Sequence, residues 1–283
     1  MSKDTFCTYE TAWCPGCGNF SILECVKTAL EELGKRPYEV LVAAGIGQAA
    51  KTPQYISANS FCGLHGRALP AATAAKIANE ALTVVVDTGD GDSYGEGGNH
   101  FIHSIRRNVD ITHLVHDNQI YGLTKGQASP TSVEGLVTDV QPNGSMNTPL
   151  NPVLMAVAAG AGFVARAFSG KREHLVSVIK QAIQYEGYAL VDILQPCVSF
   201  NKVNTFAWYN SRVYELDASY DPSDKIMSMQ KAMEFGDRIP VGILYREPKR
   251  TFHQKNPVLS AGTPLLDRKT DPAVVGRLIN KFI

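Results

Sequence analysis

The chain has 283 residues, 44% of them hydrophobic, and its 27 basic and 27 acidic side chains leave a formal net charge of zero. This length allows one large domain or two modest ones, each with a full core. A neutral balance without blocks of like charge gives no electrostatic reason to expect a nucleic acid or an anionic membrane as partner.

The apolar segments and the cysteines narrow the classes of protein further. The sequence opens without an apolar signal segment, and no apolar run approaches the roughly eighteen residues of a membrane span. We therefore expect a cytoplasmic protein. Six cysteines are too few for a disulfide framework in a chain of this length. Metal or redox chemistry is the prediction for the closely spaced pair Cys14 and Cys17.

Helix and strand patterns alternate along most of the chain. Apolar side chains at helical spacing predict a first helix over 21–33, ended by Gly34, and the apolar run 40–44 predicts a buried strand after it. Further helices are predicted over 69–81, 98–108, 151–162 and 171–187. Further strands are predicted over 82–88, 111–118, 163–168 and 188–197.

This alternation predicts the fold class. Continuous apolar strands separated by helices are typical of a parallel sheet that helices cover on both faces. We therefore predict an α/β domain with a doubly wound, mostly parallel sheet over residues 1–200. Residues 201–283 are aromatic and irregular, with one short helix, a strand at 241–246 and a charged tail that contains proline. We expect this C-terminal extension to lie over the core or over a partner subunit.

The stretch after the strand 82–88 has the character of an anion site. The strand runs into the glycine turn "GDG" at 89–91, and a helix begins near Gly98. Ligands of parallel sheets gather where strands end, and unpaired N–H groups of a turn and a helix N-terminus attract phosphate. Asp90 and Asn118, which ends the next strand, offer the oxygen ligands that Mg²⁺ prefers.

The spacing of this motif points to one cofactor. A lone "GDG" is more often a plain glycine turn, but here 26 residues separate it from an asparagine that ends an apolar strand. That arrangement is the signature of thiamine diphosphate sites, in which Mg²⁺ bridges the protein and the diphosphate.

Several phrases of the sequence resemble, in this order, the β subunit of the 2-oxoacid:ferredoxin oxidoreductases. They are "AWCPGCGNF", "LHGRA", "GDGDSYGEGGNHFIHSIRRN", "DNQIYGLTKGQASPTS" and "ILQPC". The resemblance covers about residues 10–205 and implies a sheet of the thiamine-diphosphate-binding type. It further implies magnesium held by Asp90, Asn118 and the carbonyl of Ile120.

The same resemblance implies a wider site. His65 would lie over the diphosphate, Arg67 would brace its loop, and His65, Lys125 and Leu123 are the residues expected nearest the chemistry. The residues expected to bind the cofactor are Gly47, His65, Arg67, Gly89, Asp90, Gly91, Asp92, Asn118, Ile120, Gly122 and Leu123.

The family also carries a [4Fe-4S] cluster, which explains the cysteines. Oxidative decarboxylation of a 2-oxoacid releases two electrons, and a cluster takes them one at a time before coenzyme A accepts the acyl group. The matching ligands are the pair Cys14 and Cys17 and the distant Cys197. A zinc knuckle is the alternative, but zinc needs a second close Cys or His pair that the sequence lacks.

One departure leaves the fourth ligand of the cluster open. Better-known members of the family place a cysteine after "GIG", where this chain has Gln48. Cys62, three residues before His65, is the most economical substitute, and Cys7 is a second candidate. The fourth iron could instead have an oxygen or nitrogen ligand, or be absent. Cys25 falls on an apolar helix face and is interpreted as a core thiol.

The resemblance also implies partners. One cofactor domain fits into this length, so an α-type subunit would supply the pyrimidine-binding domain and its glutamate, much of the 2-oxoacid pocket and, in many relatives, the coenzyme A site. Ferredoxin or a similar carrier would accept the electrons. Arg106 and Arg107 are candidates for docking an acidic ferredoxin, unless they are simply solvated at a helix end.

The loop 121–132 carries the substrate prediction. It resembles the loop of 2-oxoglutarate and broad-range enzymes more than that of pyruvate enzymes, and Lys125 would pair with the second carboxylate of 2-oxoglutarate. Alternatively Lys125 contacts the α chain, and the substrate is a branched-chain or broad-range 2-oxoacid. A non-redox thiamine diphosphate decarboxylase half-chain and a zinc-stabilised interaction module are the other functions that the sequence leaves open.

Overall fold

A computed structural model describes residues 5–283. Its single sheet runs in the order β2-β1-β3-β4-β6-β5-β8-β7, and all neighbouring strands are parallel except β5 and β8. The strands are β1 (Val40–Ala44), β2 (Asn59–Cys62), β3 (Thr83–Gly89), β4 (Ile111–Asp117), β5 (Phe163–Phe168), β6 (Tyr188–Leu194), β7 (Val213–Glu215) and β8 (Ile239–Arg246).

Helices connect these strands. The α-helices of the described chain are α1 (Gly18–Glu32), α2 (Thr52–Tyr55), α3 (Ala68–Ala78), α4 (Gly98–Arg107), α5 (Pro152–Ala159), α6 (Arg172–Gln184), α7 (Phe206–Asn210), α8 (Lys225–Met233), α9 (Phe252–Lys255) and α10 (Pro272–Ile279). The short turns are η1 (Pro37–Glu39), η2 (Ala49–Lys51), η4 (Leu259–Ala261), η5 (Leu265–Asp267) and the π-helical η3 (Gly91–Glu96).

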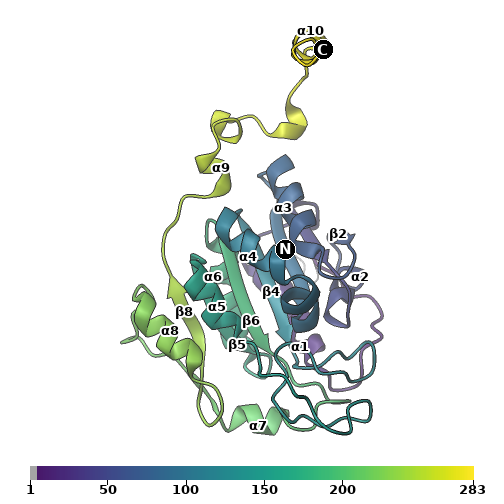
Figure 1. Ribbon diagram of the computed structural model, residues 1–283, viewed down its shortest axis with the longest axis vertical. Helices are drawn as coiled ribbons and strands as arrows, with labels where there is room; N and C mark the ends of the chain where they lie inside the picture. Colours follow the sequence, from purple (N-terminus) through teal and green to yellow (C-terminus); the bar gives the residue numbers. More distant parts are fainter. Residues whose placement is uncertain (1–4) are drawn as a thin grey trace.

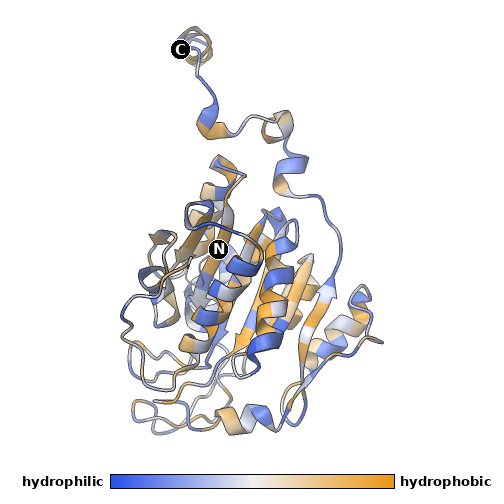
Figure 2. Ribbon diagram, turned by 180° about the vertical axis from the view of Figure 1, so that it is seen from behind, coloured by the Kyte–Doolittle hydropathy of each residue, from blue (hydrophilic) through white to orange (hydrophobic). Residues whose placement is uncertain are grey.

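Helices cover both faces of the sheet (Figure 1). The side chains of α1 and α6 share one apolar core with the sheet, and those of α3, α4 and α5 share a second core on the other face. Alternation along a strand feeds both cores: in β6, Val191 belongs to the first core and Leu190 to the second. Figure 2 accordingly shows apolar strands between helices with hydrophilic outer faces. The predicted doubly wound, mostly parallel sheet is confirmed.

The chain after residue 200 differs in detail from the prediction. It contains α7, β7 and α8 before β8, whereas the sequence predicted one short helix and one strand. The prediction also lacked α9 and α10, which follow β8. The missed elements α7, β7 and α9 have five, three and four residues, too few for a periodic signal, and α10 has eight. β8 pairs antiparallel with β5, so this part of the extension completes the sheet.

The last segment leaves the body of the molecule. After β8 the chain runs past α9 to α10, which stands apart from the sheet and its helices (Figure 1). Its apolar side chains Val274, Val275, Leu278 and Ile279 are all exposed. Across residues 5–283, no helix combines the length and the apolar character needed to cross a membrane.

Candidate functional site

The predicted magnesium residues meet at one edge of the sheet. β3 ends at Gly89, which pairs with His116 of β4, so Asp90 and Asn118 follow neighbouring parallel strands. They line a cavity of about 90 Å³. Its wall contains all the predicted cofactor residues except Arg67 and adds Ile46, Gln48, Ala49, Tyr121 and Thr124. The structure therefore gathers residues that separate segments of the chain contribute.

Asp90 is a buried carboxyl with hydroxyl partners. Only 2% of the residue is exposed, and its Oδ2 accepts hydrogen bonds from Ser129 Oγ at 2.5 Å and Thr131 Oγ1 at 2.6 Å. Burial raises its pKa, and the two hydroxyls oppose that rise. A divalent cation beside it would favour the ionised form.

Asn118 and Ile120 form a compact turn beside Asp90. The side-chain oxygen of Asn118 accepts a hydrogen bond from the backbone N–H of Ile120 at 3.0 Å. Gln119 between them has a left-handed φ of 57°, which folds the chain back on itself. Asp90, Asn118 and Ile120 thus line one cavity, and a carboxylate, an amide oxygen and a backbone carbonyl are a donor set that suits magnesium.

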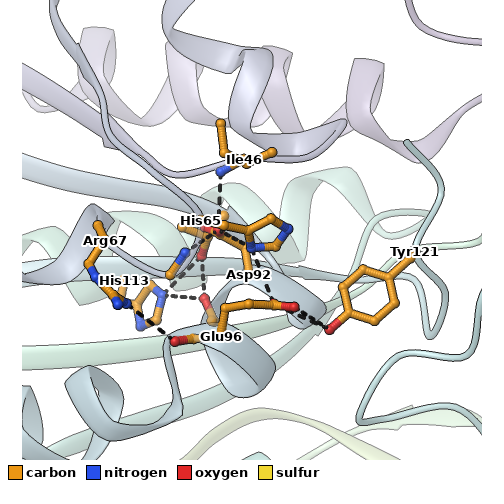
Figure 3. Close-up of polar contacts among 10 residues, drawn as sticks. Ile46, His65, Arg67, Asp92, Glu96, His113 and Tyr121 are labelled. Carbon is orange, nitrogen blue, oxygen red and sulfur yellow. Dashed lines mark hydrogen bonds and ion pairs between the residues drawn. The ribbon is translucent and has the colours of Figure 1, made fainter. Parts of the chain in front are cut away.

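Asp92 ties two loops together (Figure 3). Its Oδ1 accepts hydrogen bonds from the backbone N–H of Gly66 at 2.7 Å and of Ile46 at 3.1 Å, and lies 3.1 Å from His65 Nδ1. Burial raises the pKa of Asp92, and these three contacts oppose the rise. The carboxylate lines the cavity as predicted, and it also fixes the loops that carry Gly47 and His65.

Glu96 extends the same arrangement. Its carboxylate lies 3.2 Å from His65 Nδ1 and accepts the Tyr121 hydroxyl at 3.2 Å. Arg67 lies outside the cavity and donates to the Glu96 carbonyl at 3.5 Å, so it holds the backbone of η3 (Figure 3). Gly66 is required here, because an added Cβ would come within 2.4 Å of the Glu96 carbonyl carbon.

His113 supports η3 from within the sheet. Its Nε2 lies 2.9 Å from Ser93 Oγ, and its Nδ1 lies 2.7 Å from the Tyr188 hydroxyl. Burial lowers the pKa of His113 to about 3, so the ring is neutral at physiological pH.

A buried network of polar side chains adjoins the cavity lined by Asp90 and Asn118, which we call the cofactor cavity. Thr131 Oγ1 is 2.6 Å from Asp90 and 2.7 Å from Asp117. One hydroxyl has one proton to donate, so it can donate to only one of the two carboxyls at a time. Burial, followed by the charges of Asp192 and Asp90, raises the pKa of Asp117 well above its ordinary value and so favours its protonated form.

Three of the predicted cluster cysteines converge on a second cavity. Cys14 and Cys17 come from the loop before α1 and Cys197 from the segment after β6, and all three line a cavity of about 190 Å³. Ser199 Oγ donates to Cys14 Sγ at 3.1 Å, and Gln195 Nε2 donates to Cys17 Sγ at 3.3 Å. Donors to sulfur of this kind stabilise thiolates and tune iron-sulfur clusters.

The three thiols suit a cluster better than a single ion. Burial above all raises the pKa of Cys17 to about 11, and the charges of Cys197 and Cys14 add to the rise, so a bound cation would be needed to hold the Cys17 thiol ionised at neutral pH. Within residues 5–283, no three Cys, His, Asp or Glu side chains stand close enough to share one ion. A cubane does not need that spacing, because each of its cysteines binds a different iron.

The other cysteines lie elsewhere in the described structure. Cys62 is exposed at the end of the edge strand β2, and Cys25 is buried in the core beside α6, as interpreted from the sequence. Cys7 is exposed near the N-terminal end of the described chain. The structure thus brings Cys14, Cys17 and Cys197 together and leaves Cys62 outside their cavity.

The two cavities share a wall. Gln48, Asn118, Gly122 and Leu123 line both of them. Lys125 lines the cysteine cavity rather than the cofactor cavity, and its side chain is exposed in this chain.

Sequence reasoning missed the polar residues that support these sites. Ser129 and Thr131 lie in the loop 121–132 after Asn118, and Gln195 and Ser199 flank Cys197. These residues could have been found from the sequence, because each has a hydroxyl or an amide within a few residues of a predicted ligand in the chain, and ligands need such donors to orient them.

Family models match almost the whole chain after its first segment. Residues 40–193 match the thiamine pyrophosphate enzyme, C-terminal TPP binding domain. Residues 197–261 match the C-terminal part of the pyruvate ferredoxin oxidoreductase beta subunit.

Individual relatives agree. The chain is 45% identical to the 2-oxoacid:ferredoxin oxidoreductase subunit beta of Saccharolobus solfataricus, over 86% of this chain and 84% of that one. It is 47% identical to the 2-oxoglutarate oxidoreductase subunit KorB of Mycobacterium tuberculosis, over 70% of this chain and 53% of that one. A solved structure of 2-oxoglutarate:ferredoxin oxidoreductase from Magnetococcus marinus, with 2-oxoglutarate, coenzyme A and succinyl-CoA bound, has a TM-score of 0.90 and 37% identity, covering 98% of this chain and 94% of that one.

Proposed function

Because this chain belongs to the family of 2-oxoacid:ferredoxin oxidoreductase β subunits, we propose that it binds magnesium, thiamine diphosphate and a [4Fe-4S] cluster for the CoA-dependent oxidation of a 2-oxoacid. One observation carries the proposal: the cavity of the predicted magnesium residues and the cavity of the three cysteines share a wall. A site for decarboxylation and an exit for single electrons therefore adjoin. Family membership favours this function over the non-redox half-chain and over the zinc module.

The cofactor would lie with its diphosphate against η3. Asp90, Asn118 and the Ile120 carbonyl would hold magnesium, and Gly89 and Gly91 would let the backbone approach the diphosphate. Position 91 has room only for glycine, because a Cβ added to Gly91 would lie 2.2 Å from a ring carbon of Tyr121. Thiamine diphosphate supplies the electron sink for decarboxylation. The chain's own contribution is to position the diphosphate and to keep His65 in place through Asp92.

The cluster would lie in the cysteine cavity. Cys14, Cys17 and Cys197 would each bind one iron, and the Gln195 and Ser199 donors would stabilise the sulfurs. The cysteine loop is tied to the start of α1, because Cys17 immediately precedes that helix and its backbone N–H donates a hydrogen bond to the Cys14 carbonyl at 3.0 Å.

Two variants of the enzyme, co-expressed with its partner subunit and purified without oxygen, separate the two sites. Asp90→Asn should abolish magnesium-dependent binding of thiamine diphosphate, measured by calorimetry, and leave iron and acid-labile sulfide unchanged. Cys17→Ser should lower the iron and leave thiamine diphosphate binding intact. Loss of both properties in each single variant would contradict two separate sites.

The partner subunit should complete the active site. We propose that an α-type chain supplies the glutamate that protonates the aminopyrimidine, most of the 2-oxoacid pocket and the coenzyme A site. The isolated chain should then show no 2-oxoacid-dependent dye reduction, and turnover without a partner would overturn this assignment.

Within the C-terminal part, residues 201–283, the tail that follows β8 would face that partner. α10 stands apart from the body of the chain (Figure 1), and its apolar side chains Val274, Val275, Leu278 and Ile279 are exposed. Contiguous apolar surface of this kind marks interaction sites. A chain ending at Lys269 should co-purify less well with the α-type subunit in size-exclusion chromatography, and equal recovery would place the interface elsewhere.

We propose 2-oxoglutarate as the preferred substrate, with a broad or branched-chain range as the second candidate. Lys125 lies beside Leu123 on the wall of the cysteine cavity, and the wall continues into the cofactor cavity through Leu123. A contact between its ammonium and a distal carboxylate contributes about 1.5–3 kcal/mol. Lys125→Ala should therefore lower kcat/KM for 2-oxoglutarate by roughly ten- to a hundredfold and spare branched-chain 2-oxoacids. Equal losses for both substrates would favour the second candidate.

A further inference from the structure

The loop that carries Gln48 is fixed against the cysteine loop. Trp13, the residue before Cys14, donates its indole N–H to the Gln48 backbone carbonyl at 2.8 Å. The indole is buried and packs edge-on against the rings of Phe20 and Tyr55 at 5.4 and 4.8 Å. Residues 35 positions apart in the sequence are therefore held together independently of any ligand.

Gln48 is half-buried, and the oxygen of its side chain is buried without a hydrogen-bond partner among the described residues. Gln48 lines the cavity of the three cysteines, and within the described chain its Oε1 is buried and accepts no hydrogen bond. An unpaired buried oxygen of this kind costs about 1–3 kcal/mol, so a ligand that satisfies it is expected. Gln195 Oε1 is also unpaired, but the amide of Gln195 is already held on the Cys17 sulfur.

We propose that Gln48, and not a fourth cysteine, faces the fourth iron of the cluster. This inference rests on the cluster of the proposed function. A cubane has four irons, and the cavity offers three thiols together with the Gln48 amide. Thiolates suit iron-sulfur clusters, whereas a neutral amide oxygen is a hard and weak ligand for them.

The fourth iron is therefore the one that the protein holds least tightly. On mild oxidation a [4Fe-4S]²⁺ cluster gives one electron to ferricyanide and releases one Fe²⁺, which leaves [3Fe-4S]⁺ on the three cysteines. The missing thiolate also removes one negative charge from the cluster and its ligands. Since net charge sets the reduction potential, the potential should be higher than with four cysteines.

The test uses the anaerobic complex with its partner subunit and follows the cluster rather than turnover. Ferricyanide with an iron chelator should convert the wild-type cluster to the three-iron form, detected by electron paramagnetic resonance together with the iron-to-sulfide ratio. Gln48→Cys should resist this conversion and have a lower reduction potential. Gln48→Ala should lose the iron even more readily than the wild type. Gln54→Ala is the matched control, because Gln54 is an exposed glutamine that lines neither cavity, and it should keep the wild-type iron content and the wild-type response to oxidation.

Three outcomes would overturn the inference. In the first, the wild type and Gln48→Cys resist oxidation equally. In the second, Cys62→Ser, and not a change at Gln48, releases the iron, which would make Cys62 the fourth ligand. Both of these leave the proposed function intact. A preparation without iron or sulfide in the wild type and in Gln48→Cys would overturn the cluster of the proposed function together with this inference.

Discussion

Removing the Asp92 side chain should loosen the cofactor cavity. In Asp92→Ala, the backbone N–H groups of Gly66 and Ile46 lose their shared acceptor. The Gly66 N–H is buried, so leaving it unsatisfied costs about 1–3 kcal/mol, and the Ile46 N–H, which is only partly buried, adds less. Both groups belong to loops that shape the cavity. If about 2 kcal/mol is lost from binding, magnesium-dependent affinity for thiamine diphosphate should fall about thirtyfold.

Asp92→Asn is the matched control for this prediction. Asn keeps an oxygen where Oδ1 accepts both N–H groups, and it places its NH₂ at Oδ2, which is buried without a hydrogen-bond partner in the described structure. It also removes a carboxylate whose pKa burial has raised. We therefore expect affinity within about 1 kcal/mol of the wild type, roughly fivefold.

Calorimetric titration of the co-purified complexes with thiamine diphosphate and Mg²⁺ measures both variants, and thermal unfolding checks that each is folded. The two variants should differ clearly in affinity, with Asp92→Asn the tighter binder. If Asp92→Asn binds as weakly as Asp92→Ala, the charge of Asp92 acts on the ligand directly and the reasoning from the two N–H groups is wrong.

Three more predictions rest on single features of the structure. An added Cβ at Gly45 would lie 2.1 Å from a carboxylate oxygen, so Gly45→Ala should weaken thiamine diphosphate binding, whereas Gly98→Ala, with open space around it, should not. Burial raises the pKa of Asp192 from 3.8 to about 6. Its contribution to stability is therefore present below about pH 4 and is lost as the pH rises through about 6. Between pH 4 and 7, the free energy of unfolding of Asp192→Asn should decline less than that of the wild type. Arg106 and Arg107 are both exposed, and reversing their charges should slow ferredoxin reduction severalfold at low salt; an unchanged, salt-independent rate would exclude them from docking.

The sheet and the edge that carries Asp90 and Asn118 follow from local sequence. Apolar runs of strand length separated by amphipathic helices predicted β1, β3, β4, β5 and β6, because strands buried on both faces need apolar side chains throughout. Parallel strands place their carboxyl ends at one edge, so the positions of Asp90 and Asn118 in the sequence were enough to predict a shared site. The strand β8 was predicted, but its antiparallel pairing with β5 was not, since pairing depends on distant backbone.

The cysteine cavity shows what only the tertiary structure decides. The sequence identified Cys14, Cys17 and Cys197 through resemblance, and it gave Cys62, three residues before His65, as the most economical fourth ligand. In the structure, Cys62 at the end of the edge strand β2 does not line the cavity, whereas Gln48, whose carbonyl accepts the Trp13 indole N–H, does. Which side chains meet depends on hydrogen bonds and packing between segments that are far apart in the chain, and no periodicity or motif spacing encodes those contacts.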